Sequence, residues 1–257
     1  MLKNFINKKI LVVSHDAGGA EVLGSFIKNN QLSASFILAG PASSVFQRKL
    51  SSVIDSYELN YISKQFDVIL TGTSWQSDLE YKALQIAQDL SIKSFTFLDH
   101  WVNYQERFTR DSVTVLPDEI IVGDRFAFEL AKQTFPHTVI DFYPNQYLFD
   151  IRKVASLSSD ITADQSTILY VNEPLSSHAE LRYNDPYYWG YTEIDAIKYF
   201  FRHVHVLFPH VKSVIFRPHP SEKNISYDWI KGLTPLDVVI NSEINLIEQV
   251  LSVSLVF

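Results

Sequence analysis

The sequence has 257 residues, of which 46% are hydrophobic and 20% charged, so a substantial core can form and wholesale disorder is excluded. The formal net charge is −7 and no basic run alternates with aromatics, which excludes nucleic acid as the expected partner. Cysteine is absent, so disulfides, thiol catalysis and cysteine-held metal sites are excluded as well.

We expect neither a signal peptide nor a membrane span at the beginning of the chain. The apolar run that follows the first lysines is only Ile10-Leu11-Val12-Val13, which is too short for either. We therefore expect a cytoplasmic protein without a transmembrane segment, and peripheral association with a membrane stays open.

Residues 1–143 alternate short apolar segments with amphipathic ones, and no two apolar segments are joined by Asn-Gly or Asp-Gly. This alternation predicts an α/β domain with a parallel, doubly wound, Rossmann-like sheet. The predicted strands are residues 9–14, 35–38, 57–62, 67–71, 93–98, 119–122 and 138–142.

The first strand leads into His15-Asp16-Ala17-Gly18-Gly19 and then an amphipathic helix. Glycines at such a turn let the backbone come close to a ligand at the helix N-terminus, although the pattern is not the dinucleotide fingerprint G-x-G-x-x-G. His15 and Asp16 are candidate catalytic residues, with Asp16 as general base. The alternative is that Asp16 only caps the helix.

Polar residues also follow two later strands of this half. Ser74 lies in a hydroxyl-rich loop after residues 67–71 and is a candidate for binding an anion, although most loop serines have no such role. Residues 77–80 form a predicted capping box. The strand 93–98 is followed by Asp99, His100 and Trp101, a density of polar and aromatic groups typical of a pocket wall. The alternative is a buried Asp99–His100 pair that supports the fold.

The pattern stops at residue 144 and restarts at residue 166. Residues 144–165 are interpreted as a linker, because the stretch from 152 onward is polar and rich in serine. Residues 166–257 predict a second Rossmann-like domain with strands at 166–171, 214–216, 236–240 and 253–257, and with helices at 192–207 and 243–251. An aromatic loop separates the first of these strands from a helix that Thr192 caps.

The second half contains an apolar strand that runs into Arg217-Pro218-His219-Pro220-Ser221. Each proline holds the residue before it extended, at the strand end where open parallel sheets bind ligands. A guanidinium and an imidazole fixed there suit an anion such as a phosphate, whereas the alternative is a stiff loop with two exposed basic residues. The surrounding stretch carries a positive surplus, namely Lys198, Arg202, Lys212 and Lys223. His203 and His205 cannot share a helix face, so no metal pair is expected.

The Arg-Pro-His-Pro stretch after a strand of a second α/β half resembles the His-Pro motif of bacterial sialyltransferases and Kdo transferases, and more loosely the glycerophosphotransferases of teichoic acid synthesis. These are GT-B glycosyltransferases, with two doubly wound domains. The resemblance implies metal-independent transfer of a sugar from a CMP-linked or other nucleotide donor to a surface glycan, as in capsule or lipopolysaccharide synthesis. It implies donor binding by Arg217, His219, Pro220, Ser221 and Glu173, a base at Asp16 or Asp99, and an acceptor side at Gly18, Gly19, Ser74, His100 and Trp101.

Two departures separate the chain from these enzymes. The Asp/Glu-Asp/Glu-Gly base motif is replaced by His-Asp-Ala-Gly-Gly, and the second domain is shorter than usual and is expected to be incomplete. Two alternatives therefore stand beside transfer: a sugar-nucleotide epimerase or hydrolase of the same fold, and a binding or scaffold protein without turnover. The apolar strand 253–257 also predicts a homo-oligomer that covers this edge.

Overall fold

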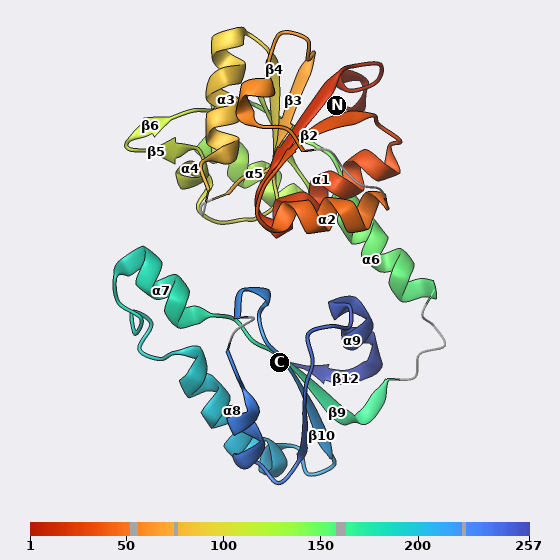
Figure 1. Ribbon diagram of the computed structural model, residues 1–257, viewed down its shortest axis with the longest axis vertical. Coiled ribbons are helices and arrows are strands. Elements are labelled where there is room, and N and C mark those ends of the chain that lie inside the picture. The colour runs from red at the N-terminus through yellow and green to blue at the C-terminus, as the bar shows by residue number, and fades with distance from the viewer. Residues whose placement is uncertain (52–55, 75–76, 158–162, 223–224) are drawn as a thin grey trace. The chain divides into compact units, whose positions relative to one another are not determined.

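The protein folds into two compact α/β units, each built on a parallel sheet flanked by helices (Figure 1). A computed structural model describes residues 1–51, 56–74, 77–157, 163–222 and 225–257. The first unit spans Met1–Asp150 and the second Ile151–Phe257. The parallel α/β class predicted from the alternating pattern is confirmed.

The first unit contains a six-stranded sheet of order β2-β1-β3-β4-β7-β8, in which all neighbours are parallel. The order reverses at β1, because the chain moves from β1 to β2 on one side and then crosses to β3 on the other. Ligands of open α/β sheets bind at such a switch point. The strands are β1 (Ile10–Ser14), β2 (Ala34–Leu38), β3 (Val68–Thr71), β4 (Lys93–Leu98), β7 (Glu119–Val122) and β8 (Val139–Phe142).

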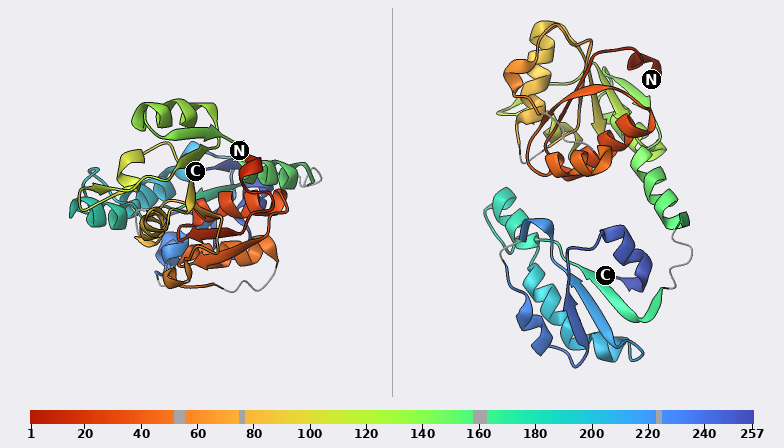
Figure 2. Two further views of the ribbon diagram at one scale, coloured as in Figure 1. Left: turned by 90° about the horizontal axis from the view of Figure 1, so that it is seen from above. Right: turned by 45° about the vertical axis from the view of Figure 1, so that its right-hand side comes forward.

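The central strands β1, β3, β4 and β7 are buried on both faces, which explains why they read as continuous apolar runs, whereas the edge strand β8 is partly exposed. Ile10 and Val12 face a core shared with α1 (Ala17–Asn29) and α2 (Pro41–Leu50), which lie side by side in Figure 2. Leu11 and Val13 face the opposite core, against α3 (Leu79–Leu90). Helix α5 (Arg125–Thr134) packs against β7 on the same face of the sheet as α3.

Three local elements of this unit differ from the prediction. The segment 57–62 contains a 3₁₀ turn, Leu59–Tyr61, in place of a strand. The predicted capping box at 77–80 is wrong: Ser77 Oγ accepts from the backbone N–H of Leu79 at 3.1 Å, but the Glu80 carboxylate accepts from His15 and the Ser77 N–H donates to Ser74 Oγ. A helical turn α4 (Tyr104–Arg107) and a two-stranded antiparallel hairpin, β5 (Thr109–Arg110) with β6 (Val113–Thr114), follow the β4 loop. Asp111 and Ser112, at the turn of this hairpin, both have positive φ. Glycine is the residue usually found in this conformation, and the turn contains none.

Helix α6 (Gln146–Leu157) occupies much of the predicted linker 144–165. Its first turns pack on the first unit, where Asp150 accepts hydrogen bonds from Ser25 Oγ at 2.6 Å and Asn29 Nδ2 at 2.9 Å. The buried Lys49 ammonium lies 2.7 Å from Ser25 Oγ and 3.6 Å from Asp150. These hydrogen bonds lower the pKa of Asp150 against the opposing effect of its partial burial. This network lies just before the polar, serine-rich stretch that indicates a linker.

The second unit contains a four-stranded parallel sheet of order β11-β10-β9-β12. Its order also reverses, because β10 and β11 lie on one side of β9 and β12 on the other. The aromatic loop predicted after the first strand includes an additional helix, α7. The elements are β9 (Asp164–Val171), α7 (Leu175–Tyr183), α8 (Glu193–Leu207), β10 (Ser213–Arg217), β11 (Asp237–Ile240), α9 (Leu246–Ser252) and β12 (Val253–Val256).

Helix α8 supplies most of the core of this unit, as its helical spacing predicts. Phe201 and Val204 pack against Val214 and Phe216 of β10. The predicted cap is confirmed: Thr192 Oγ1 accepts from the backbone N–H of Asp195 at 3.3 Å, and the Asp195 carboxylate completes a capping box. Among the described residues, no helix is long and apolar enough to cross a membrane.

Candidate functional site

The loops after β1, β3 and β4 lie next to one another, because these strands are neighbours in the sheet and run in the same direction. They carry every candidate that the sequence predicts in the first unit: His15 to Gly19, Ser74, and Asp99 to Trp101. The chain therefore gathers its polar groups at the switch point between β1 and β3, where open parallel sheets bind ligands.

Asp16 is held by hydrogen bonds to one of its two oxygens. Its Oδ1 accepts from Ser74 Oγ at 2.8 Å and lies 2.7 Å from His15 Nδ1. Asp16 occupies the N-cap position of α1 but makes no capping hydrogen bond with its side chain, so the capping interpretation is wrong. In the described part of the chain, Oδ2 has no hydrogen-bond partner, and the side chain is 22% exposed. A carboxylate oriented in this way can accept a proton from a ligand.

His15 is fixed on both its backbone and its ring. Its backbone N–H donates to Glu80 Oε1 at 2.7 Å. Its ring packs on Gly40, where φ is +53° and a Cβ atom would lie 2.6 Å from Nε2. Glycine at this position thus allows both the backbone conformation and the approach of the imidazole. The ring is in consequence directed to Asp16.

Glu80 is a buried carboxyl group beneath this loop, and sequence reasoning assigns it only a capping role. Burial raises its pKa to about 7, and the nearby charge of Asp16 acts in the same direction. Its Oε2 is buried and has no hydrogen-bond partner among the described residues. Glu80 therefore holds a proton far more readily than an exposed glutamate does.

Asp99 pairs with an arginine and not with the adjacent histidine. Arg107 Nη1 lies 3.3 Å from Asp99 Oδ1 and donates to Thr73 Oγ1 at 2.5 Å. Burial raises the pKa of Asp99, and Arg107 opposes that shift. A Cβ atom on Gly18 would lie 2.5 Å from Asp99 Oδ2, so glycine is required for this approach. The alternative of a buried Asp99–His100 pair is wrong, because His100 is exposed.

Gly19 and Gly72 bring the start of α1 against the loop after β3. A Cβ atom on either glycine would lie 3.5 Å from the other's Cα atom. Ser14 Oγ lies 3.5 Å from the Cβ position of Gly72; it is buried and has no hydrogen-bond partner in the described ranges. A Cβ atom at either position would make only ordinary van der Waals contacts, so the packing at the base of the site does not depend on glycine there.

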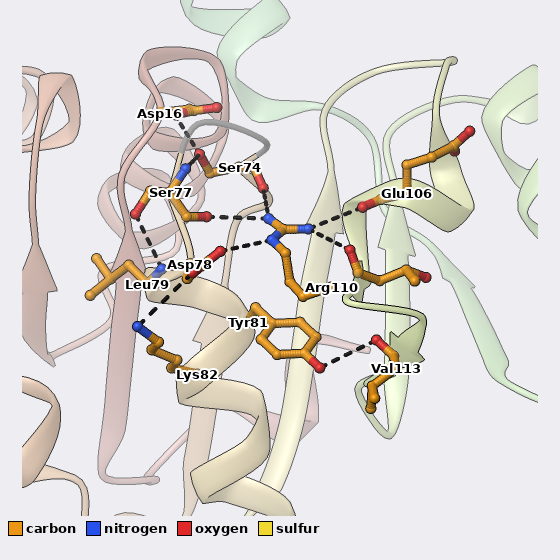
Figure 3. Close-up of polar contacts among 11 residues, drawn as sticks. Asp16, Ser74, Ser77, Asp78, Leu79, Tyr81, Lys82, Glu106, Arg110 and Val113 are labelled. Atoms are coloured by element: carbon orange, nitrogen blue, oxygen red, sulfur yellow. Dashed lines mark hydrogen bonds and ion pairs between the residues drawn. The ribbon is translucent and has the colours of Figure 1, made fainter. Parts of the chain in front are cut away.

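The loop that carries Ser74 is held by Arg110 of the β5–β6 hairpin (Figure 3). The guanidinium donates to the Ser74 carbonyl at 2.7 Å, to the Ser77 carbonyl at 3.3 Å and to Asp78 Oδ1 at 2.8 Å. It also donates to the carbonyls of Glu106 at 3.1 Å and Thr109 at 2.9 Å. All five N–H groups of Arg110 are therefore used.

Trp101 leaves the site and lies on the surface. Its Nε1–H donates to Asp124 Oδ2 at 2.8 Å, while Asp124 Oδ1 caps α5. The ring meets Phe126 edge to face with centroids 6.3 Å apart, and Trp101 is 56% exposed. The structure therefore gives Trp101 a fixed position, with much of its indole in solvent.

In the second unit, Arg217 is at the end of β10, as the sequence predicts, and its guanidinium contacts α9 and the segment before it. Nη1 donates to the Ile244 carbonyl at 2.6 Å and to Gln249 Oε1 at 2.5 Å. In the described segments, Nε and Nη2 have no hydrogen-bond partner within the protein. Arg217 is thus anchored through one nitrogen and retains three N–H groups for a ligand.

His219 is oriented by its two C-terminal neighbours. Its Nδ1 accepts from the Ser221 backbone N–H at 3.2 Å and lies 2.7 Å from Ser221 Oγ. Since Nδ1 accepts, the neutral ring carries its proton on Nε2. The His178 ring of α7 lies 6.4 Å away, edge to face. Pro220 is exposed and begins a 3₁₀ turn, Pro220–Glu222, that carries Ser221.

Glu222 is the centre of this turn, although sequence reasoning treats it only as the one acid in a basic stretch. It is buried, and its Oε2 accepts from the His219 backbone N–H at 2.9 Å and from Asn172 Nδ2 at 2.9 Å. Its Oε1 accepts from Tyr227 OH at 2.6 Å. Burial, together with this carboxylate, raises the pKa of Tyr227. The sequence signal that could have indicated this buried network is Asn172, a polar residue directly after a buried strand.

Glu173 differs from its neighbour Asn172, because its side chain is exposed and its carbonyl accepts from Leu175 N at 2.9 Å. Lys223, part of the predicted basic surplus, lies outside the described residues. Over the ranges that are described, no group of three or more His, Asp or Glu side chains could hold a metal ion. The sequence matches no protein-family model and no curated protein.

Proposed function

We propose that this protein is a GT-B-type glycosyltransferase that moves a sialic acid-like or Kdo-like sugar from a CMP-linked donor to a glycan acceptor. The observation that carries the proposal is the Asp16 carboxylate at the switch point of the first unit. His15 and Ser74 engage one oxygen, and the other is available to an acceptor hydroxyl.

In the proposed reaction, Asp16 Oδ2 takes the proton of an acceptor hydroxyl while that oxygen attacks the anomeric carbon of the donor sugar. The bond from this carbon to the donor phosphate breaks, and its electron pair leaves with CMP. The charge of Asp16 raises the pKa values of Glu80 and Asp99, to which burial contributes most.

The leaving phosphate requires donors that neutralise its charge. In the second unit, the Nε2–H of His219 and the remaining N–H groups of Arg217 supply such donors at the C-terminal ends of parallel strands. The buried Glu222 turn keeps the His219 backbone in place. This arrangement supports a phosphate-binding role for the Arg-Pro-His-Pro stretch.

The test is thermal stability in the presence of CMP, CDP, UDP and GDP, followed by transfer assays. A ligand present at a hundredfold excess over its Kd stabilises the folded state by about 2.7 kcal/mol. We expect a CMP-selective rise that Arg217→Ala with His219→Ala removes. The matched control is Arg202→Ala with His210→Ala, two exposed residues of the same unit. No rise with any nucleotide would refute the proposal, and hydrolysis of the donor without acceptor would favour a hydrolase instead.

A further inference from the structure

Five aromatic side chains gather on the surface of the second unit, between α7 and α8. They are 37–58% exposed, and none belongs to the hydrophobic core of the unit. The core of the unit uses phenylalanines such as Phe201 and Phe216, whereas every ring of this segment carries a hydroxyl or an indole N–H. We call Tyr183, Tyr187, Tyr188, Trp189 and Tyr191 the aromatic ridge.

Local hydrogen bonds and contacts between the rings fix the conformation of the ridge. Asp185 Oδ1 accepts from the Tyr187 N–H at 2.8 Å, and the Gly190 N–H donates to the Tyr187 carbonyl at 2.6 Å. Gly190 has φ of +81°, which favours glycine. The rings of Tyr183 and Tyr188 stack with centroids 3.6 Å apart, and Trp189 meets both edge to face at 5.9 Å. A ligand would not have to order these rings, which lowers the entropic cost of binding.

Helix α7 connects the ridge to the C-terminal end of β9. It begins at the last residue of α7 and ends at Thr192, where Glu193 accepts from Ser176 N at 2.8 Å and from Ser176 Oγ at 2.7 Å. Ser176 lies in the first turn of α7, close after β9. The nine residues of α7 rise about 13 Å and separate the end of β9 from the start of the ridge, so a ligand that reaches from one to the other is extended.

The chemistry of the ridge selects the class of ligand. Residues 175–191 contain no lysine, and their one arginine, Arg182, lies over the Tyr183 ring at 5.5 Å. Anionic lipid surfaces and single-stranded nucleic acid both require a positive surface, which is missing here. A pyranose presents a face of C–H groups and a rim of hydroxyls, which matches tyrosine and tryptophan rings with polar ends.

We propose that the aromatic ridge binds an oligosaccharide chain, so that the acceptor is a polymeric glycan and not a monosaccharide. Naming this ligand as the acceptor rests on the proposed function, whereas the binding itself does not. The rings stack on successive sugars, and Asn184 and Asp185 provide polar groups beside them.

The experiment screens the full chain on an array of defined bacterial-type oligosaccharides. It then titrates the best-bound structure as chains of one, two, four and six sugars by calorimetry. We expect affinity to rise with chain length, and Tyr188→Ala with Trp189→Ala to weaken binding at least tenfold. The control Tyr199→Ala removes an exposed tyrosine of α8 outside the ridge and leaves the affinity unchanged. Circular dichroism confirms that each variant is folded.

Three results would overturn the inference: no oligosaccharide binds, the double variant binds as tightly as the wild type, or the ridge binds phosphatidylglycerol vesicles instead. The proposed function is tested separately: it is refuted if CMP does not raise the thermal stability of the wild-type protein. Glycan binding without a CMP effect leaves the ridge assignment intact. A CMP effect with transfer only to acceptors that do not require the ridge refutes the assignment of the ridge ligand as the acceptor and leaves the proposed function intact.

Discussion

Replacing Glu80 by glutamine changes how the stability of the first unit depends on pH. Burial raises the pKa of Glu80 from 4.5 to about 7, and a pKa that differs by one between the folded and unfolded states corresponds to about 1.4 kcal/mol. The ionised side chain therefore costs the folded state about 3 kcal/mol. Below pH 4.5 both states are protonated and there is no cost. Between pH 4.5 and 7 the folded state retains the proton that the unfolded state loses, so stability falls as the pH rises.

In Glu80→Gln the amide oxygen still accepts from the His15 N–H, but no proton titrates. We expect the variant to gain about 3 kcal/mol relative to the wild type between pH 4.5 and 8. Any constant cost of burying the amide NH₂ cancels in this difference. Hydrogen exchange in urea, followed on peptides from β1 and β3 and corrected for intrinsic rates, measures unfolding of this unit separately.

Glu129→Gln, which removes an exposed carboxylate from α5, is the matched control and should show no comparable trend. If the difference between wild type and Glu80→Gln is the same at pH 5 and pH 8, ionisation of Glu80 does not oppose folding. The account of the buried carboxyl group would then be wrong.

Three further substitutions test the two sites. Asp16→Asn should lower kcat for transfer at least about a hundredfold, as for loss of a general base, while the CMP effect on melting persists; unchanged transfer would exclude Asp16 as the base. Glu222→Gln should destabilise the second unit by about 1–3 kcal/mol in urea titrations, because the new amide NH₂ faces buried donors, whereas exposed Glu173→Gln should not. Gly18→Ala should lower the melting temperature, since its Cβ atom would lie 2.5 Å from the Asp99 carboxylate. Gly232→Ala, with no atom within 4 Å of its Cβ position, should have little effect on it.

The strands could be predicted because their signal is local. Each buried strand of the first unit is a short apolar run, and the alternation of such runs with helical stripes defines a parallel sheet. Because the ends of parallel strands meet at one edge, the sequence also locates His15, Asp16, Ser74 and Asp99 in one region. The structure places them there.

The partners of these residues could not be predicted, because they depend on contacts between segments far apart in the chain. Glu80 has the spacing of a capping residue, yet it accepts a hydrogen bond from a residue 65 positions earlier. Asp99 has a histidine beside it in sequence but pairs with Arg107. Helix α6 falls within the predicted linker, yet its Asp150 accepts hydrogen bonds from side chains of α1 more than a hundred residues away. Such long-range pairs cannot be predicted from local composition.

Arg110 has a consequence for how this protein tolerates mutation. Its five donors point to acceptors on the Ser74 loop, on α4 and on its own hairpin, in the plane that a guanidinium imposes. Lysine has three donors around one point and cannot span them. In a saturation-mutagenesis library at position 110, no substitution would therefore be conservative. We expect every substitution to lower the proposed transfer activity, as if Arg110 took part in the chemistry, although Arg110 holds the loop from which Ser74 contacts Asp16.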